Sequence, residues 1–380
     1  MAAKRGKRAG GRKARDAAGA PEIVRRKSDH VDISLSDSVL HTSNLWDDVT
    51  LVHCALPELD LAEVDTSTRL LGAQLGAPIV IASMTGGHAH GADINDRLAA
   101  AAAELRLAMG VGSQRPALEH PSYARTYAAL RRHDVPLVIA NIGAPQLVKQ
   151  RGGAAPMGVR QAREAMEMVG ADVLAVHLNF LQEVAQPEGD TNGKGVLDAI
   201  ARLAGDLPVM VKETGAGISR EVALQLKAAG VRAIDVGGAG GTSFAAVEAF
   251  RSRDRGLLGR ARLGMTFKDW GIPTPVSVLE ADVGLPVIAT GGVRSGLDAA
   301  RALALGASAA GVARRLLPAS LAGGRETLDE LRLIVDELRA AMFLTGAADV
   351  GGMRGREVVL SDRLMGWLGR LADDQGEDGR

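Results

Sequence analysis

Short apolar segments rich in Val and Ile recur through residues 78–314 and alternate with stretches of helical character. The eight segments are residues 78–83, 108–112, 136–143, 172–179, 208–214, 233–238, 286–292 and 309–314. Between them, stretches such as 94–107, 220–230 and 295–307 place Ala, Leu, Glu and Arg at helical spacing. Because buried strands that alternate with helices indicate a covered parallel sheet, this pattern predicts an α/β fold, a (β/α)8 TIM barrel. A doubly wound open sheet is the alternative.

The composition excludes several classes of protein. With 46% hydrophobic residues in 380, the chain can bury a large core, and 47 glycines against 3% aromatic residues argue against an aromatic-cored all-β fold. The formal net charge is zero, so no overall field favours nucleic acid or a membrane surface. The single cysteine, Cys54, excludes an internal disulfide and fits a reducing compartment. No apolar run has the length of about 18 residues that a membrane span needs. We therefore expect a cytoplasmic protein that binds neither membrane nor nucleic acid.

The chain is expected to divide into three parts. Residues 1–20 are strongly basic and are predicted to form a disordered tail. Residues 21–350 would form the barrel, with 45–65 as a covering layer, and 351–380 a C-terminal extension with an acidic end. Within residues 23–40, a cluster of Arg25, Arg26, Lys27 and His30 is either an anion clamp or a solvated charged surface.

A group of polar side chains follows the apolar run 172–176. His177, Asn179, Gln182 and Glu183 bring an imidazole, two carboxamides and a carboxylate to the predicted C-terminal end of a strand. Active sites of barrel enzymes lie at this end of the strands. The four groups could hold a metal-bound anion, or they could serve only the backbone of the next loop.

Glycine-rich stretches follow two neighbouring predicted strands, at 237–243 and 291–296. The backbone N–H groups of such loops can cradle a phosphate, with the hydroxyl of Thr242 or Ser243 beside them, although tight turns also need glycine. Lys212, at the end of the segment 208–214, would either face the pyrimidine edge of a flavin or balance a carboxylate such as Glu213.

From about residue 25 to 346 the sequence resembles the type 2, flavin-dependent isopentenyl diphosphate isomerases. The blocks that carry the resemblance are RRKSDH (25–30), DDVTLVHCALPE (47–58), SMTGG (83–87), MGVGSQR (109–115), HLNFLQE (177–183) with QPEGD (186–190), VKETGAGIS (211–219), IDVGGAGGTS (234–243), DWGIPT (269–274) and GGVRSGLD (291–298). The resemblance implies interconversion of isopentenyl and dimethylallyl diphosphate in isoprenoid biosynthesis. It also implies FMN, Mg2+, NADPH as the flavin reductant, and a homo-tetramer or larger assembly.

The resemblance further implies roles for individual residues. FMN would be contacted by Ser83, Met84, Thr85, Ser113, Asn141 and Lys212, and its phosphate by Thr242, Gly291, Gly292, Ala313 and Arg314. The substrate would be bound by Arg26, Lys27, Ser113, Arg115, His177, Asn179 and Gln182. Glu183 would ligate Mg2+, and Gln182 would be the catalytic residue near the reacting carbons. Phe180 departs from the family pattern, which often has a smaller residue or proline there, and we expect it to serve packing.

Moving the double bond of an unactivated alkene requires a proton delivered to one carbon and another removed at the allylic position. No cysteine stands at a predicted strand end, which excludes a thiol acid. A carboxamide has no useful pKa, so Gln182 is expected to position the substrate or relay a proton. One alternative is an FMN oxidoreductase acting on a hydroxy acid, which needs a His beside an Arg at a late strand end. The stretches that follow the later predicted strands, 237–243 and 291–296, contain Arg294 but no His. The other alternative is a catalytically silent flavin-binding or polyanion-binding protein.

Overall fold

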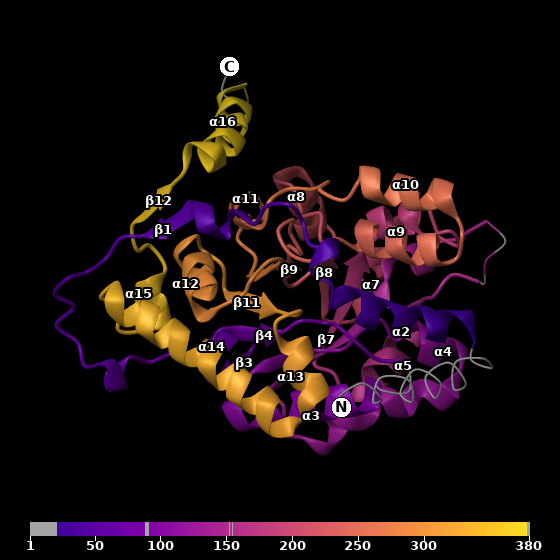
Figure 1. The fold of residues 1–380 in the computed structure, drawn as a ribbon, viewed down its shortest axis with the longest axis horizontal. Helices are drawn as coiled ribbons and strands as arrows, with labels where there is room; N and C mark the ends of the chain where they lie inside the picture. The colour runs from indigo at the N-terminus through magenta and orange to yellow at the C-terminus, as the bar shows by residue number, and fades with distance from the viewer. Residues whose placement is uncertain (1–20, 88–90, 152, 154, 378–380) are drawn as a thin grey trace, which may run out of the picture.

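The protein, seen in a computed structural model, is described for residues 21–87, 91–151, 153 and 155–377, so the predicted basic tail lies outside the described residues. Eight parallel strands close into a barrel in the order β4 to β11 (Figure 1). They are β4 (Ile79–Ile81), β5 (Ala108–Gly110), β6 (Leu137–Gly143), β7 (Val173–Leu178), β8 (Val209–Glu213), β9 (Ile234–Asp235), β10 (Val287–Thr290) and β11 (Ala309–Val312). The last strand pairs with the first, with Ala310 opposite Ile79. The predicted barrel is confirmed and the open sheet is wrong.

Helices cover the outside of the barrel. The main ones are α3 (Gly91–Leu105), α5 (Val159–Val169), α7 (Val196–Asp206), α8 (Arg220–Ala228), α9 (Phe244–Asp254), α11 (Thr274–Glu280), α12 (Gly296–Ala304) and α14 (Gly324–Leu344). The hydroxyls of Ser219, Ser243 and Ser295 cap α8, α9 and α12 by accepting the backbone N–H three residues later. Gly230 and Gly306 follow the C-caps of α8 and α12 with positive φ, the conformation in which glycine commonly ends a helix.

Shorter elements fill the connections. They are α4 (Arg115–Glu119), α6 (Phe180–Ala185), α10 (Leu258–Thr266), α13 (Leu316–Ala322), α15 (Val350–Met353), η3 (Leu61–Glu63), η4 (Pro121–Thr126), η5 (Ala128–Arg132) and η6 (Ala144–Leu147). The hairpin of β2 (Thr68–Leu70) and β3 (Ala73–Leu75) packs Leu70 and Leu75 against residues at the beginnings of the strands, such as Val80 and Leu137. This hairpin therefore closes the N-terminal end of the barrel, and the C-terminal end is left for a site.

The N-terminal segment crosses that C-terminal end. It consists of α2 (Glu22–Ser34), η1 (Asp37–Val39) and η2 (Leu45–Asp48). Leu40 bridges to Thr242, and the N–H of His41 donates to the carbonyl of Gly241 at 2.9 Å. The segment is thus part of the wall of the site, in addition to the covering layer predicted from residue 45 onward.

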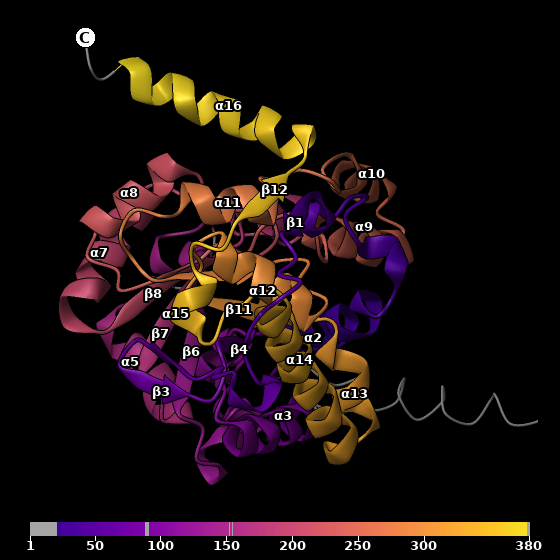
Figure 2. The same cartoon turned by 90° about the vertical axis from the view of Figure 1, so that its left-hand side faces the viewer.

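The C-terminal extension is tied to the covering layer. Strand β1 (Val49–Leu51) pairs antiparallel with β12 (Val358–Leu360), and α16 (Asp362–Glu377) then runs away from the body of the barrel (Figure 2). Within the part of the chain that the structure describes, no helix is long and apolar enough to cross a membrane.

Candidate active site

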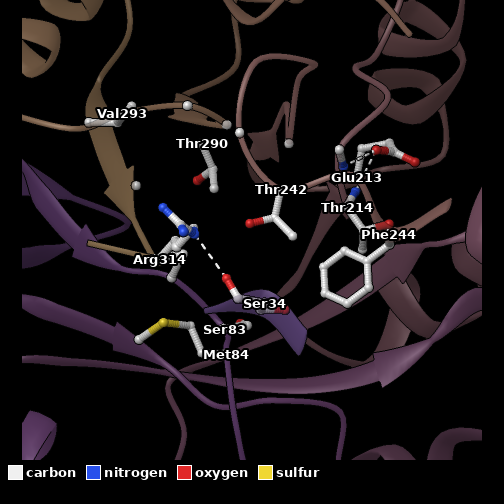
Figure 3. A pocket seen from close by; sticks show the side chains of 18 of the residues that line it. Ser34, Ser83, Met84, Glu213, Thr214, Thr242, Phe244, Thr290, Val293 and Arg314 are labelled. Carbon is white, nitrogen blue, oxygen red and sulfur yellow. Dashed lines mark hydrogen bonds between the residues drawn. The ribbon is translucent and has the colours of Figure 1, made fainter. Parts of the chain in front are cut away.

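A pocket of about 720 Å³ opens at the C-terminal ends of the strands, between them and the N-terminal segment (Figure 3). Fourteen of the predicted site residues line it: Lys27, Ser83, Met84, Thr85, Ser113, Asn141, His177, Gln182, Lys212, Thr242, Gly291, Gly292, Ala313 and Arg314. The four others, Arg26, Arg115, Asn179 and Glu183, do not line this pocket. The structure thus brings most of the predicted residues together, while their individual roles stay predictions.

The two glycine-rich loops pack against each other with no space for side chains. Gly291 and Gly292 have φ of +118° and +70°. A Cβ on Gly291 would lie 2.3 Å from the carbonyl oxygen of Gly238, and one on Gly292 would lie 2.7 Å from that of Gly240. Glycine is therefore required by both conformation and space, and backbone groups form this part of the pocket wall.

The side chain of Arg314 also contacts the N-terminal segment. Its Nε donates to the carbonyl of Ser34 at 2.9 Å, as Figure 3 shows, and its Nη2 donates to the carboxylate of Asp37 at 2.6 Å. The guanidinium thereby holds the end of α2 against the barrel. These bonds use Nε and Nη2, and the predicted contact of Arg314 with a cofactor phosphate stays a prediction.

Lys212 is buried at the end of β8, and its Nζ donates to the carbonyl of Glu213 at 2.8 Å. The carboxylate of Glu213 is hydrogen-bonded to the loop that follows β8. Its Oε2 accepts the N–H groups of Thr214, Gly215 and Ala216 within 2.6 Å. Burial raises the pKa of Glu213 to about 7 despite these donors. Lys212 makes no hydrogen bond to that carboxylate, but its ammonium lowers the pKa of Glu213 and of buried Asp235, its register neighbour, against the effect of burial. This agrees with the expected balancing of a carboxylate, and the contact with a flavin stays a prediction.

A hydrogen bond to Asn141, on the neighbouring strand β6, selects one tautomer of His177. The Nδ2 of Asn141 donates to the carbonyl of Val111 at 3.0 Å, so its Oδ1 accepts from the Nδ1–H of His177 at 2.7 Å. Burial and the nearby ammonium of Lys212 hold the pKa of His177 well below its usual value. The imidazole is therefore neutral near pH 7, and the bond to Asn141 places its hydrogen on Nδ1.

The carboxylate of Glu183 is buried next to the residues that are predicted to bind the diphosphate. Glu183 accepts from the Nδ2 of Asn179 at 2.8 Å and from the N–H of Asp190 at 2.8 Å, and burial raises its pKa. Arg115 pairs with Asp190 at 2.7 Å. The Oδ1 of Asn179 is buried without a partner among the described residues. This cluster presents hard oxygen atoms beside the pocket. Phe180, next in the chain, packs against the core as predicted.

Two basic groups of α2 face the same region. Lys27 lines the pocket, and burial followed by the charge of Arg26 lowers its pKa to about 8. The Nη1 of Arg26 lies 4.0 Å from Glu188, and its Nε is buried with no hydrogen bond to a described residue. Arg26, Lys27 and His30 are thus folded against the site, whereas Arg25 is exposed, and binding of an anion by this cluster stays a prediction.

Glu248 is a site residue that the sequence analysis missed. It is fully buried on α9, and its Oε1 accepts from the Nε2 of Gln182 at 3.3 Å and from His30 at 2.7 Å. Arg251 donates to its Oε2 at 3.0 Å. A signal was present in the sequence, because Glu248 is the one charge within the apolar run 244–250. A lone carboxylate in such a run needs a buried partner.

Comparison with known proteins shows which sequences this chain is similar to. Residues 196–359 match the FMN-dependent dehydrogenase family. The chain is 45% identical over 346 residues to the isopentenyl-diphosphate delta-isomerase of Thermoplasma acidophilum, covering 91% of this chain and 99% of the relative. It is 48% identical over 345 residues to the enzyme of that name from Methanoregula boonei, covering 89% and 94% of the two chains.

Solved structures support the fold at a greater distance. A mandelate oxidase variant with (S)-mandelic acid matches with a TM-score of 0.58 and 20% identity, covering 92% of this chain and 97% of that one. A mandelate oxidase with benzoyl-formic acid matches with a TM-score of 0.55 and 20% identity, with the same two coverages. At such low identity the likeness shows the barrel fold alone.

Proposed function

The chain belongs to the type 2 isopentenyl-diphosphate delta-isomerases, a flavin-dependent family, and we propose that it interconverts isopentenyl and dimethylallyl diphosphate using reduced FMN, Mg2+ and NADPH as the flavin reductant. The observation that carries the proposal is the composition of the pocket. It brings two kinds of anion-binding group to one cavity: the glycine loops after β9 and β10, and Lys27 on α2. Gln182 lines the same cavity. One cavity can therefore hold a cofactor phosphate and a substrate diphosphate.

The residues present fit FMN. The pocket volume of about 720 Å³ is within the usual range for cofactor sites. The close-packed Gly291 and Gly292 present backbone where a side chain would block a phosphate. Lys212 offers an ammonium group to the ring, and Met84 and Thr85 offer a wall. Bound in its reduced form, FMN supplies a proton donor at N5 and an electron-rich face beside developing positive charge.

The residues also fit Mg2+ held jointly with the substrate. No group of three His, Cys, Asp or Glu side chains in the described part of the chain forms a metal cage. Mg2+ commonly binds through one or two carboxylates together with substrate phosphates. Here Glu183 would supply the carboxylate, and the Oδ1 of Asn179, which has no hydrogen-bond partner among the described residues, would supply a further oxygen. The ion would neutralise part of the diphosphate charge.

The protein's own part in the reaction is to position the substrate and to control the transfer of protons. Lys27 and Arg26 bind the diphosphate end, which holds the short hydrocarbon end within the cavity. The hydrogen bond from Gln182 to Glu248 fixes the orientation of the carboxamide, because the carboxylate only accepts. Gln182 then positions the alkene or relays a proton, without titrating itself.

The competing FMN oxidoreductase function is disfavoured by Arg294. Its Nη2 lies 2.6 Å from Asp47 and its Nε 3.2 Å from Asp298. Such a guanidinium is already paired with two carboxylates, whereas oxidation of a hydroxy acid needs an arginine available to the substrate carboxylate. The silent-binder alternative gives no reason for the contacts that half-buried Gln182 and buried His30 make with Glu248 beside the pocket.

One assay separates the three functions. Purified protein is incubated with isopentenyl diphosphate, FMN, NADPH and Mg2+, and both dimethylallyl diphosphate and NADPH are followed. Product formed without net consumption of NADPH supports the isomerase. Oxidation of NADPH in step with the reduction of an added 2-keto acid to the hydroxy acid would support the oxidoreductase, and bound flavin with no turnover would support the silent binder.

Assembly and location are further parts of the proposal. We propose that the protein forms a homo-tetramer or larger assembly in the cytoplasm, as its resemblance to the family implies. Light scattering on the eluted protein measures the mass of the assembly, and fluorescence microscopy of a tagged chain tests its location in the cell.

A further inference from the structure

Two side chains of the N-terminal segment donate hydrogen bonds to the loop that follows β10. The Nδ2 of Asn44 donates to the carbonyl of Gly292 at 2.7 Å, and the Nε1 of Trp46 donates to the carbonyl of Gly291 at 3.0 Å. Trp46 is fully buried, so its donor is fixed by packing as well as by this bond. Two successive carbonyls of one loop are thus held from the same side.

Holding these carbonyls fixes the opposite side of the loop. A peptide unit is planar and trans, so the carbonyl of Gly291 points away from the N–H of Gly292, and the carbonyl of Gly292 points away from the N–H of Val293. Both Gly292 and Val293 line the pocket. Their N–H groups donate to no acceptor among the residues that the structure describes.

The contact between the two segments continues to Asp47 and Arg294. The Oδ1 of Asp47 pairs with the Nη2 of Arg294 at 2.6 Å, and the Oδ1 of Asn44 also accepts the N–H of Trp46 at 3.3 Å. A Cβ on Gly292 would lie 2.8 Å from that Oδ1. The loop therefore has little freedom to rotate its peptide planes while the segment 44–47 is in place.

We propose that Asn44 and Trp46 are positioning residues for the cofactor phosphate. They lock two consecutive peptide planes so that the N–H groups of Gly292 and Val293 face the anion as a preformed pair of donors. This inference rests on the proposed function, since it takes the phosphate of FMN as the anion. A preformed pair binds more tightly because its ordering is complete before the ligand arrives.

Trp46→Phe tests the proposal directly, because it keeps an aromatic ring in the core and removes the donor. The matched control is Trp270→Phe, since Trp270 is 62% exposed. Flavin-stripped wild type and both variants are titrated with FMN and, separately, with riboflavin, which lacks the phosphate. Quenching of flavin fluorescence reports Kd. We expect Trp46→Phe to raise Kd for FMN about tenfold, with riboflavin affinity and the control unchanged.

Asn44→Ala gives an independent second measurement at the other peptide plane, with the same expected selectivity. FMN affinities of both variants within about twofold of wild type would overturn the proposal. So would equal losses for FMN and riboflavin, because these would indicate a general structural effect. Wild-type protein that binds neither flavin would instead overturn the proposed function, which keeps the two failures distinct.

Discussion

The Nε2 of His30 lies 2.7 Å from the Oε1 of Glu248, and this contact joins α2 to α9 across 218 residues of sequence. Burial disfavours the charged form of Glu248, but His30 and the guanidinium of Arg251 outweigh it and lower the pKa to about 2. Burial lowers the pKa of His30. Near neutral pH a carboxylate therefore meets a neutral imidazole, and His30 must carry its hydrogen on Nε2 because the carboxylate only accepts.

Replacing Glu248 by Gln should slow turnover. His30 and Gln182 both donate to the same oxygen of Glu248, and a carboxamide accepts less strongly and only at one of its two positions. A buried charge-assisted hydrogen bond is worth about 1.5–3 kcal/mol, so kcat is expected to fall at least about tenfold with FMN affinity unchanged. Steady-state kinetics measures the effect, with Glu221→Gln on the exposed face of α8 as control. A kcat equal to that of the control would contradict the role of Glu248.

Gln182→Ala should reduce turnover while bound FMN stays in place. The side chain lines the pocket and its carboxamide is oriented by Glu248, so its loss removes a group near the reacting carbons and leaves the flavin loops intact. The measurement is kcat beside the flavin absorbance of the same preparation. Gln225→Ala, on the outer helix α8, serves as the control. Unchanged turnover in Gln182→Ala would refute the assignment.

The activity should fall at alkaline pH because of Lys27. Burial lowers the pKa of Lys27 to about 8 in the ligand-free protein, so the ammonium loses its proton as the pH rises through that value. A bound diphosphate raises the pKa again, which means that binding above pH 8 must take up a proton. We expect kcat/KM to decline above about pH 8 and the decline to vanish in Lys27→Arg, because arginine stays charged. Identical alkaline profiles for the two proteins would show that another group titrates.

Arg251 should matter more for stability than its neighbour Arg255. The side chain of Arg251 is 4% exposed and pairs with Glu188 and fully buried Glu248, so Arg251→Met leaves a buried carboxylate without its cation. Breaking such a buried pair should lower the free energy of unfolding by about 3 kcal/mol. Arg255 is 42% exposed, and Arg255→Met should cost less than about 1 kcal/mol. Urea unfolding compares the two, and equal losses would be inconsistent with this ranking.

Much of the fold could be predicted because its signals are local. Each strand of the barrel lies within one predicted segment, including β9, which has only two residues, Ile234 and Asp235. A parallel barrel also gathers the ends of its strands at one rim, so Ser83, His177 and Lys212 could be expected to share a site before any contact was known.

The parts that escaped prediction depend on contacts between distant segments. Asn44 and Gly292 are 248 residues apart, and nothing in the sequence around Asn44 indicates that its amide holds a loop of the barrel. Glu248 lies within a helix instead of at a strand end, so reading the strand ends passed over it. The pairing of Arg314 with Ser34 and Asp37 is likewise decided by where α2 crosses the rim.

The most direct test of a flavin-assisted proton transfer is isomerisation followed by NMR in D2O, with flavin-stripped protein and the same protein reconstituted with reduced FMN. We predict that only the reconstituted protein, supplied with Mg2+, converts isopentenyl diphosphate and places deuterium in a methyl group of the product. Conversion at the same rate by the flavin-stripped protein would contradict the proposed chemistry.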